Sequence, residues 1–261
     1  MTILDLIPNI YLHLSVYILI FTRISAFFAT FILFHREHIN ARILIALSSV
    51  LSMITLFNVT SSYPSFEIVS VNMALNCLFE FLIGFLAGLI LNILLDIFSS
   101  AGQIISTQIG LSFASVVDPS LGSMTSLSKF YAFFSMIFFF DLNGHLIVIT
   151  TLLKSFDTIR LNSLALPTDI FKQIFAYSSV IFSGGVLLSI VIMVSTILVN
   201  ISFAVMTRFA PQFNIFSIGI TLTLIFGLVC ICESFNDFVS SSGNYIIYAF
   251  NLLNKAMGVV H

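Results

Sequence analysis

Long stretches of apolar residues recur along this chain, and they constrain its fold more than any other feature of the sequence. Runs of about 20 apolar residues match the hydrocarbon core of a bilayer, roughly 30 Å thick, when they coil as a helix. These runs do not alternate apolar and polar residues with period two, as the strands of a transmembrane barrel do. The sequence therefore predicts an all-α integral membrane protein with several spans. The apolar segments lie near residues 10–34, 41–59, 68–98, 127–153, 174–206 and 213–232, and a weaker amphipathic tail follows at 235–253.

The composition excludes several classes of soluble protein. Hydrophobic residues make up 59% of the 261 residues and charged residues only 8%, whereas an ordinary soluble domain carries about 25% charged residues. The net charge of −2 provides no basic surface for nucleic acid, so we expect no nucleic-acid partner.

The basic residues of the connecting loops do not alternate from one side of the membrane to the other. We therefore expect that one segment is re-entrant or that the chain does not simply cross the membrane back and forth.

A row of polar and small residues runs along the third apolar segment at intervals of four. This spacing makes a ridge that winds around the helix, and Gly84 and Gly88 would let a second backbone approach closely. Helix packing is the simpler interpretation. A polar channel lining is the alternative, because Glu80 and Asp96 would each cost about 2.5–3.5 kcal/mol against lipid. The row comprises Asn72, Asn76, Glu80, Gly84, Gly88, Asn92 and Asp96.

Arg23 lies within the first apolar segment. A cation at that depth needs a carboxylate, a carbonyl or water, and Glu80 is its best candidate partner. The alternative is a shorter segment from which Arg23 extends to the membrane interface.

The fourth apolar segment is interrupted by Asp141-Leu-Asn-Gly-His145. Asn-Gly is a turn signal, and a turn at membrane depth is tolerated only where protein buries it or where it lines a cavity. We therefore expect two half-helices joined by a short hairpin, which would also explain why the loop charges do not alternate, with His145 as a hydrogen-bonded structural residue.

No motif nominates an enzyme. His35 and His38 lack a further zinc ligand, and the cysteines Cys77, Cys230 and Cys232 lie in apolar runs without a disulfide framework. No P-loop, Rossmann fingerprint or nucleophile elbow occurs. The sequence predicts no catalytic residue, no metal and no cofactor.

Three stretches of the sequence are more specific than composition. Residues 102–122 read GQIISTQIGLSFASVVDPSLG, which closely resembles the central loop of the flagellar biosynthetic protein FliR family. Asn143-Gly144-His145 and the run 208–219, which begins Arg208-Phe-Ala-Pro211, match the same family in order and spacing. The resemblance covers nearly the whole chain. At one position the chain departs from the family, because Thr221 stands where a proline is common; this predicts a helix that is locally straighter.

The resemblance implies a non-enzymatic subunit of the flagellar type III protein export gate, in the bacterial inner membrane at the flagellar basal body. A FliP-like portion, about residues 1–175, would be fused to a FliQ-like hairpin and tail, about 176–261. One copy would assemble with several FliP-like and FliQ-like subunits, and with FlhB-like and FlhA-like components, around a conduit for unfolded proteins. Membrane lipid would surround the assembly. The alternatives are the equivalent subunit of a virulence-type system (SpaR-like or YscT-like), a scaffold subunit without a gate, and a stand-alone transporter or channel for small solutes.

In the family the central loop is part of a plug in the pore, so the resemblance implies that residues 102–122 obstruct the conduit here. Glycines would let the loop bend, glutamines would hydrogen-bond across a narrow lumen, and Asp118-Pro119 would initiate a turn. The candidate plug residues are Gly102, Gln103, Gln108, Gly110, Phe113, Asp118, Pro119 and Gly122. The candidate buried polar and packing residues are Arg23, Glu80, Gly84, Gly88, Asp96, Asn143, Gly144, His145, Arg208 and Pro211.

Overall fold

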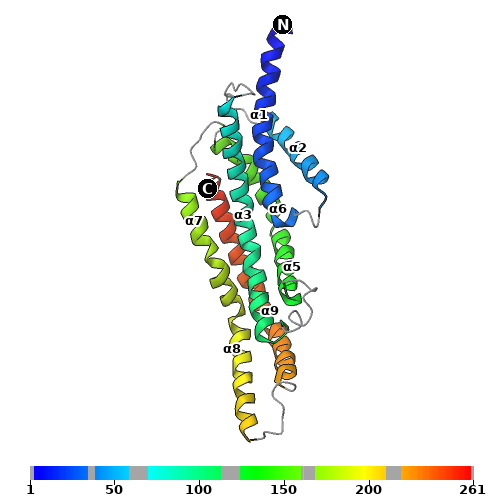
Figure 1. Ribbon diagram of the computed structural model, residues 1–261, viewed down its shortest axis with the longest axis vertical. Coiled ribbons are helices and arrows are strands. Elements are labelled where there is room, and N and C mark those ends of the chain that lie inside the picture. Colours follow the sequence, from blue (N-terminus) through cyan, green and yellow to red (C-terminus); the bar gives the residue numbers. More distant parts are fainter. Residues whose placement is uncertain are drawn as a thin grey trace. The chain divides into compact units, whose positions relative to one another are not determined.

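The computed structural model describes residues 3–34, 39–58, 70–112, 124–159, 161, 168–209 and 219–259, and these parts are helical, with no strand among them (Figure 1). The all-α class predicted from the sequence is therefore confirmed. The elements are α1 (Ile3–Thr30), η1 (Ile32–Phe34), α2 (Ala41–Asn58), α3 (Val71–Gln108), α5 (Ser126–Asp141), α6 (Gly144–Thr158), α7 (Thr168–Ser178), α8 (Val180–Phe209) and α9 (Ile220–Ala256).

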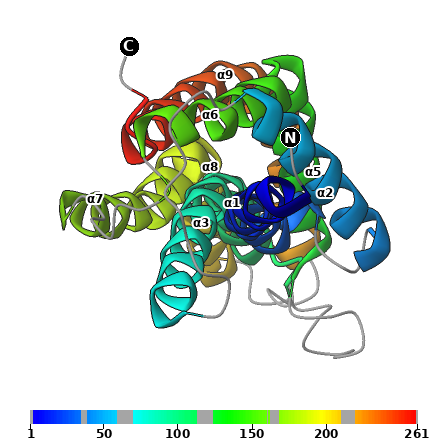
Figure 2. The ribbon, with the colours of Figure 1, turned by 90° about the horizontal axis from the view of Figure 1, so that it is seen from above.

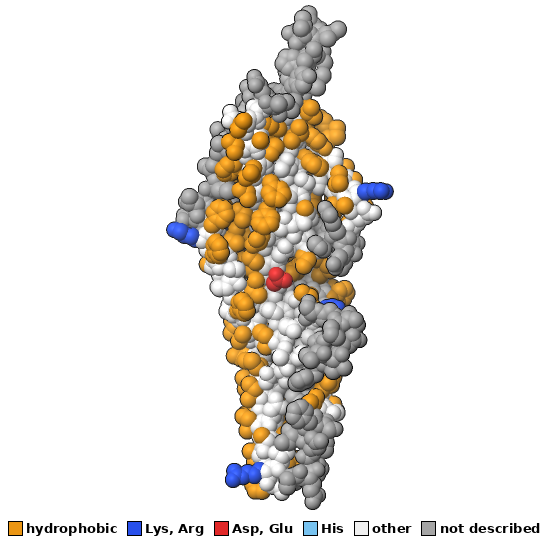
Figure 3. Space-filling model, viewed as in Figure 1, with side chains coloured by type: hydrophobic (Ala, Val, Ile, Leu, Met, Phe, Trp, Pro, Cys, Tyr) orange, Lys and Arg blue, Asp and Glu red, His pale blue; other side chains and the backbone are white. Residues whose placement is uncertain are grey.

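Five stretches of the described chain are long and apolar enough to cross a membrane, or six if α5 and α6 count together as one broken span. They lie in α1, α2, α3, α9 and the stretch Ile170–Phe209, which contains most of α7 and all of α8. On the face shown in Figure 3, hydrophobic side chains are widespread and charged ones are few. The chain is a multi-pass membrane protein.

Several helices bury small or polar residues and expose large apolar ones. The buried side of α2 carries Ser48, Ser52 and Thr55, whose hydroxyls donate to the carbonyl four residues earlier. The exposed side of α2 carries Ile43 and Phe57. This arrangement is the reverse of a soluble protein and suits an apolar environment, where small residues allow helices to approach and apolar ones meet lipid or another subunit.

The chain folds into two compact units, each built from segments far apart in the sequence. The first unit comprises Met1–Asn92, Gly144–Phe175 and Ala249–His261, and the second comprises Ile93–Asn143 and Ala176–Tyr248. The long helix α3 contributes its first part to one unit and its last part to the other.

In the first unit, α1 stands between α2 and the N-terminal part of α3 when seen from above (Figure 2). Its apolar face is fully buried, with Leu19, Ile20 and Ile24 at most 1% exposed. On the α2 side, the Tyr17 hydroxyl lies 2.8 Å from Ser49 Oγ.

The core of the second unit is aromatic. Phe98 of α3 and Tyr131 of α5 both meet Phe238 of α9 edge-on, at centroid distances of 5.8 and 4.7 Å. On α8, a Cβ added at Gly185 would overlap Ser100 Oγ, which donates to the Ile181 carbonyl at 3.0 Å. Glycine thus lets α8 lie against α3.

Two segment boundaries predicted from the sequence are wrong. The third helix continues to Gln108 rather than ending near residue 98, because Ala101, Ile105 and Ile109 are buried at four-residue intervals and prolong its core-facing row. Gly102, Gln103 and Gln108 are therefore helical and not loop residues. The tail at 235–253 is continuous with the last apolar segment in α9, since polar side chains alone do not interrupt a backbone ladder that lacks proline.

Candidate functional site

The connection between α3 and α5 is held together at its base. Gln103 Oε1 of α3 accepts hydrogen bonds from the Thr125 amide at 3.4 Å and the Thr125 hydroxyl at 3.2 Å. Ser128 Oγ donates to the Ser99 carbonyl at 2.8 Å and lies 2.9 Å from Ser99 Oγ. Thr125 also caps α5, because its hydroxyl accepts from the Ser128 amide at 3.3 Å. Both ends of the connection are thereby fixed side by side.

A glycine makes this approach possible. A Cβ added at Gly102 would lie 2.7 Å from Ser128 Cα and 2.9 Å from the Leu127 carbonyl oxygen. Both atoms belong to the backbone of α5, so neither can move aside cheaply. We call Ser99, Gly102, Gln103, Thr125 and Ser128 the loop base.

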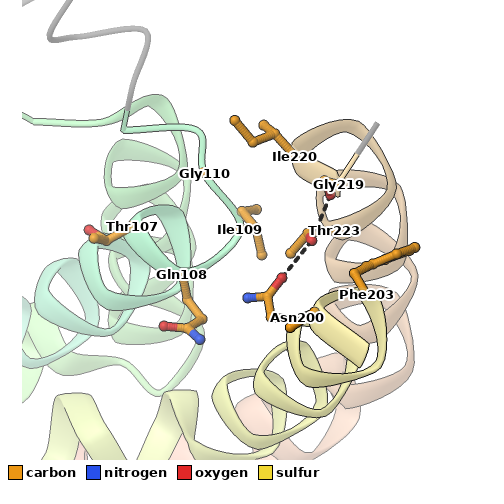
Figure 4. A pocket seen from close by; sticks show the side chains of 10 residues that line it. Thr107, Gln108, Ile109, Gly110, Asn200, Phe203, Gly219, Ile220 and Thr223 are labelled. Atoms are coloured by element: carbon orange, nitrogen blue, oxygen red, sulfur yellow. Dashed lines mark hydrogen bonds between the residues drawn. The ribbon is translucent and has the colours of Figure 1, made fainter. Parts of the chain in front are cut away.

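A pocket of about 350 Å³ lies at the same end of α3 (Figure 4). Gly110, at φ 86°, takes the left-handed conformation that glycine favours and turns the chain out of the helix. Figure 4 shows Ile109 pointing toward Asn200 of α8 and Thr223 of α9, whose side-chain oxygens lie 2.8 Å apart. The lining consists of Thr107, Gln108, Ile109, Gly110, Asn200, Phe203, Ala204, Gly219, Ile220 and Thr223.

The first unit contains a buried ion pair. Arg23 Nε lies 2.5 Å from Glu80 Oε2, and these side chains are 0% and 5% exposed. The guanidinium also donates to Ser155 Oγ at 2.9 Å and to the Ile159 carbonyl at 3.3 Å, and its carbon lies 4.2 Å from the Phe156 ring centroid. The pairing of Arg23 with Glu80 expected from the sequence is confirmed. Because the partners come from α1, α3, α6 and the residue that follows α6, the pair joins three helices.

The polar ridge of α3 packs against α1, as its spacing predicts. A Cβ at Gly84 would overlap the Arg23 carbonyl oxygen, and one at Gly88 would lie 2.8 Å from the Thr30 Cβ. Asn92 caps the end of α1, because its amide donates to the Thr30 carbonyl and its side-chain oxygen accepts from the Ile32 amide, both at 2.8 Å. In this part of the ridge, the polar and small residues serve helix packing.

The comparisons with known proteins point to one family. Residues 14–247 match the model of a family described as bacterial export proteins, family 1. Over 208 residues the chain is 33% identical to the flagellar biosynthetic protein FliR of Buchnera aphidicola subsp. Baizongia pistaciae, an alignment that covers 79% of this chain and 80% of that protein. The chain belongs to the FliR family.

Two further relatives show the breadth of the FliR family. The FliR of Buchnera aphidicola subsp. Schizaphis graminum is 30% identical over 246 residues, covering 87% of this chain and 91% of the relative. The surface presentation of antigens protein SpaR of Shigella flexneri is 28% identical over 158 residues, covering 59% and 61%. This FliR-family chain is a subunit of a type III export apparatus and associates with other components of it; the family is not a known enzyme family.

The remaining predicted residues of this FliR-family chain lie within a helix, at a helix break, at a helix end or outside the described residues. The interruption expected in the fourth segment is confirmed, since α5 ends at Asp141 and α6 begins at Gly144, with Asn143 at φ 54°. Gly144 is buried and His145 half-buried at the start of α6. Asp96 is half-buried in α3, and Arg208 is exposed in the last turn of α8. Phe113, Asp118, Pro119, Gly122 and Pro211, like the pair His35 and His38, lie outside the described residues.

Sequence reasoning missed several residues that the structure brings together. Thr125, a threonine just before an apolar run, carries the ordinary signal of a helix N-cap and could have been found. Ser128 and Ser155 carry no such signal, because a serine within an apolar helix looks the same wherever it points. In the described parts of the chain, no group of three His, Cys, Asp or Glu residues could hold a metal ion.

Proposed function

We propose that this chain is a non-enzymatic subunit of the flagellar type III export gate in the bacterial inner membrane, at the flagellar basal body. It assembles with FliP-like and FliQ-like subunits, and with FlhB-like and FlhA-like components, around the conduit for unfolded substrates. The alignments with two flagellar biosynthetic proteins cover 79% and 87% of this chain, whereas the alignment with SpaR covers 59%, which favours the flagellar system over a virulence-type one. Residues 1–175 are the FliP-like portion and 176–261 the FliQ-like hairpin.

The exposed surface supports an assembled subunit rather than a solitary transporter. In the stretch Ile170–Phe209 only 17% of the most apolar window is buried inside the chain, so α8 has a large surface available to lipid and other subunits. Arg23 and Glu80, the polar path of a solitary transporter, are instead locked to each other and shielded by Phe156.

The connection between α3 and α5 is the plug, and the loop base is the observation that carries this proposal. Seventeen residues, 109–125, join Gln108 to Ser126, and connections of that length in compact proteins are usually either functional or linker segments. Because Gln103 holds Thr125 and Gly102 meets the backbone of α5, the loop is anchored at both ends like a strap. We propose that substrate or partner binding opens the conduit by shifting the population away from the obstructed state.

The test is a deletion within the strap. Removing Gly110–Ser115 leaves eleven residues to connect ends that the loop base already holds together, so the complex should still assemble. We expect greater leakage of small ions through membranes that contain the assembled complex, measured with an ion-sensitive dye. Unchanged leakage in an assembled complex would contradict the plug.

A matched pair of substitutions tests the anchor. Gln103→Leu removes the acceptor for Thr125 and should raise leakage less than the deletion does, because the strap loses only one anchor. Thr150→Val alters a threonine on the exposed side of α6, whose hydroxyl donates to the Leu146 and Ile147 carbonyls of its own helix, and should leave leakage at the wild-type level. Equal leakage of these two variants would show that the Gln103 anchor has no role in closure.

A further inference from the structure

Ile109 ends the buried row of α3, and the helices α8 and α9 hold its side chain. It follows Gln108, the last residue of α3, and is 0% exposed. A Cβ added at Gly227 of α9 would overlap Ile109 Cγ2, and it would lie 3.8 Å from Thr196 Cγ2 of α8. Glycine at position 227 therefore makes room for the side chain of Ile109.

The two threonines near Ile109 have their hydroxyls satisfied. Thr196 is 0% exposed, and its hydroxyl donates to two carbonyls of its own helix at 2.8 and 3.0 Å. The Thr223 hydroxyl donates to Asn200 Oδ1 at 2.8 Å, and Figure 4 shows Ile109 pointing toward this pair. An apolar side chain can therefore pack here without leaving a polar group unsatisfied. We call the space between Thr196, Thr223 and Gly227 the socket.

The socket holds the chain at the point where it leaves α3. The amide of Ile109 still donates to the Ile105 carbonyl at 3.0 Å, as in the helix. The next residue, Gly110, turns the chain away with its φ of 86°, a conformation that glycine adopts at little cost. Ile109 is thus both the end of the helical row and the first residue of the strap, 109–125. Its position determines where the strap begins.

The socket borders the cavity of about 350 Å³, since Ile109 and Thr223 also line that cavity. An apolar side chain beside an open space has fewer contacts to lose than one that is enclosed on all sides. Release of Ile109 from the socket therefore costs less than release from a closed core would.

We propose that Ile109 is a positioning residue for the plug. In the socket it holds the start of the strap in the position that obstructs the conduit, and it leaves the socket when the conduit opens. The helices α8 and α9 thereby control the strap through one apolar side chain. This inference rests on the proposed function, because it requires that the strap is the plug.

A substitution on α9 tests the socket without altering the strap. Gly227→Ala fills the place of Ile109 Cγ2, and the full chain is assembled with the other gate subunits. Leakage of small ions should rise about tenfold, which corresponds to about 1.4 kcal/mol between the held and released positions. The control Gly243→Ala lies on the same helix, where the added methyl group meets nothing within 4 Å, and should leak like the wild type. Wild-type leakage of an assembled Gly227→Ala complex would overturn the proposal.

A reversible cross-link tests the release of Ile109. A Cβ at Gly227 would lie 3.1 Å from Ile109 Cβ, near the separations of about 3.5–4.5 Å that disulfides span. Ile109→Cys and Gly227→Cys are combined after Cys77, Cys230 and Cys232 are replaced by alanine. Oxidation should abolish export of substrate into the medium and reduction should restore it, which a purely structural role would not produce.

The matched control for the cross-link is Ile109→Cys alone in the same background, which should export equally under oxidising and reducing conditions. Equal export by the cross-linked and reduced double variant, or no cross-link in the assembled complex, would overturn the proposal. The deletion of Gly110–Ser115 tests the plug separately. If that deletion raises leakage while Gly227→Ala and the cross-link have no effect, the plug stands and the socket does not control it.

Discussion

Replacing Glu80 by leucine should destabilise this protein more than replacing Arg23 by methionine. In Glu80→Leu the guanidinium of Arg23, which is fully buried, loses its only carboxylate within the described residues. It stays charged, because arginine does not deprotonate in proteins. In Arg23→Met the carboxyl group of Glu80 remains, and it can become neutral by taking up a proton.

The contacts that remain around Arg23 set where in the general range the effect should fall. Breaking a buried ion pair by removing one partner costs about 3–5 kcal/mol. Glu80→Leu leaves Arg23 with the Ser155 hydroxyl at 2.9 Å, the Ile159 carbonyl at 3.3 Å and the ring of Phe156. Because these three contacts remain, we expect a loss at the lower end, about 3 kcal/mol.

The double variant Arg23→Met with Glu80→Leu should recover most of that loss. Replacement of a buried pair by apolar side chains of similar volume is often neutral, and Ser155 Oγ keeps its bond to the Leu152 carbonyl at 2.6 Å. The free energy of unfolding is measured on the full chain in mild detergent by titration with sodium dodecyl sulfate, followed by circular dichroism. The reasoning fails if the double variant is as unstable as Glu80→Leu, because the two charges would then be uncoupled.

Two other predictions use the same assay. Gly84→Ala should lower the free energy of unfolding by about 1–3 kcal/mol, since the new methyl group overlaps the Arg23 carbonyl oxygen. The control Gly243→Ala, whose methyl group meets nothing within 4 Å, should raise it by about 0.5–1 kcal/mol. Equal effects of the two substitutions would refute the close approach. Asn143→Val should lower the free energy of unfolding by about 1–2 kcal/mol, because the φ of 54° at this position is left-handed. Asn143→Gly should stay within about 0.5 kcal/mol of the wild type. If the valine variant is as stable as the glycine variant, the turn has another conformation.

Much of the fold was predictable because it depends on local patterns. Apolar runs of bilayer length indicated the helices, and Asn143-Gly144 indicated the break in the fourth segment. The four-residue spacing of Gly84 and Gly88 indicated a close helix crossing, and a lone arginine in an apolar run made Glu80 its best candidate partner. Each of these inferences needs only the period of the helix or the cost of a charge in lipid.

The end of α3 was not predictable in the same way. Gly102 and Gln103 stand in a stretch rich in polar and small residues, which favours a loop when only local propensity is considered. The helix continues because its buried row is prolonged through Ile105 and because Gly102 meets the backbone of α5. Tertiary packing therefore overrides propensity here.

The amino-acid order is enough to establish a helical membrane protein of the FliR family, since hydrophobic length and motif spacing can be read along the chain. It does not reveal that Gln103 holds Thr125 across 22 positions, that Arg23 reaches Ser155 across 132, or that the acids of α9 remain exposed. Those facts depend on which faces of the helices contact one another. The contacts between helix faces depend on packing between segments that are distant in the sequence. Residues of the same type can therefore cap a helix, contact another helix or remain exposed, according to their neighbours.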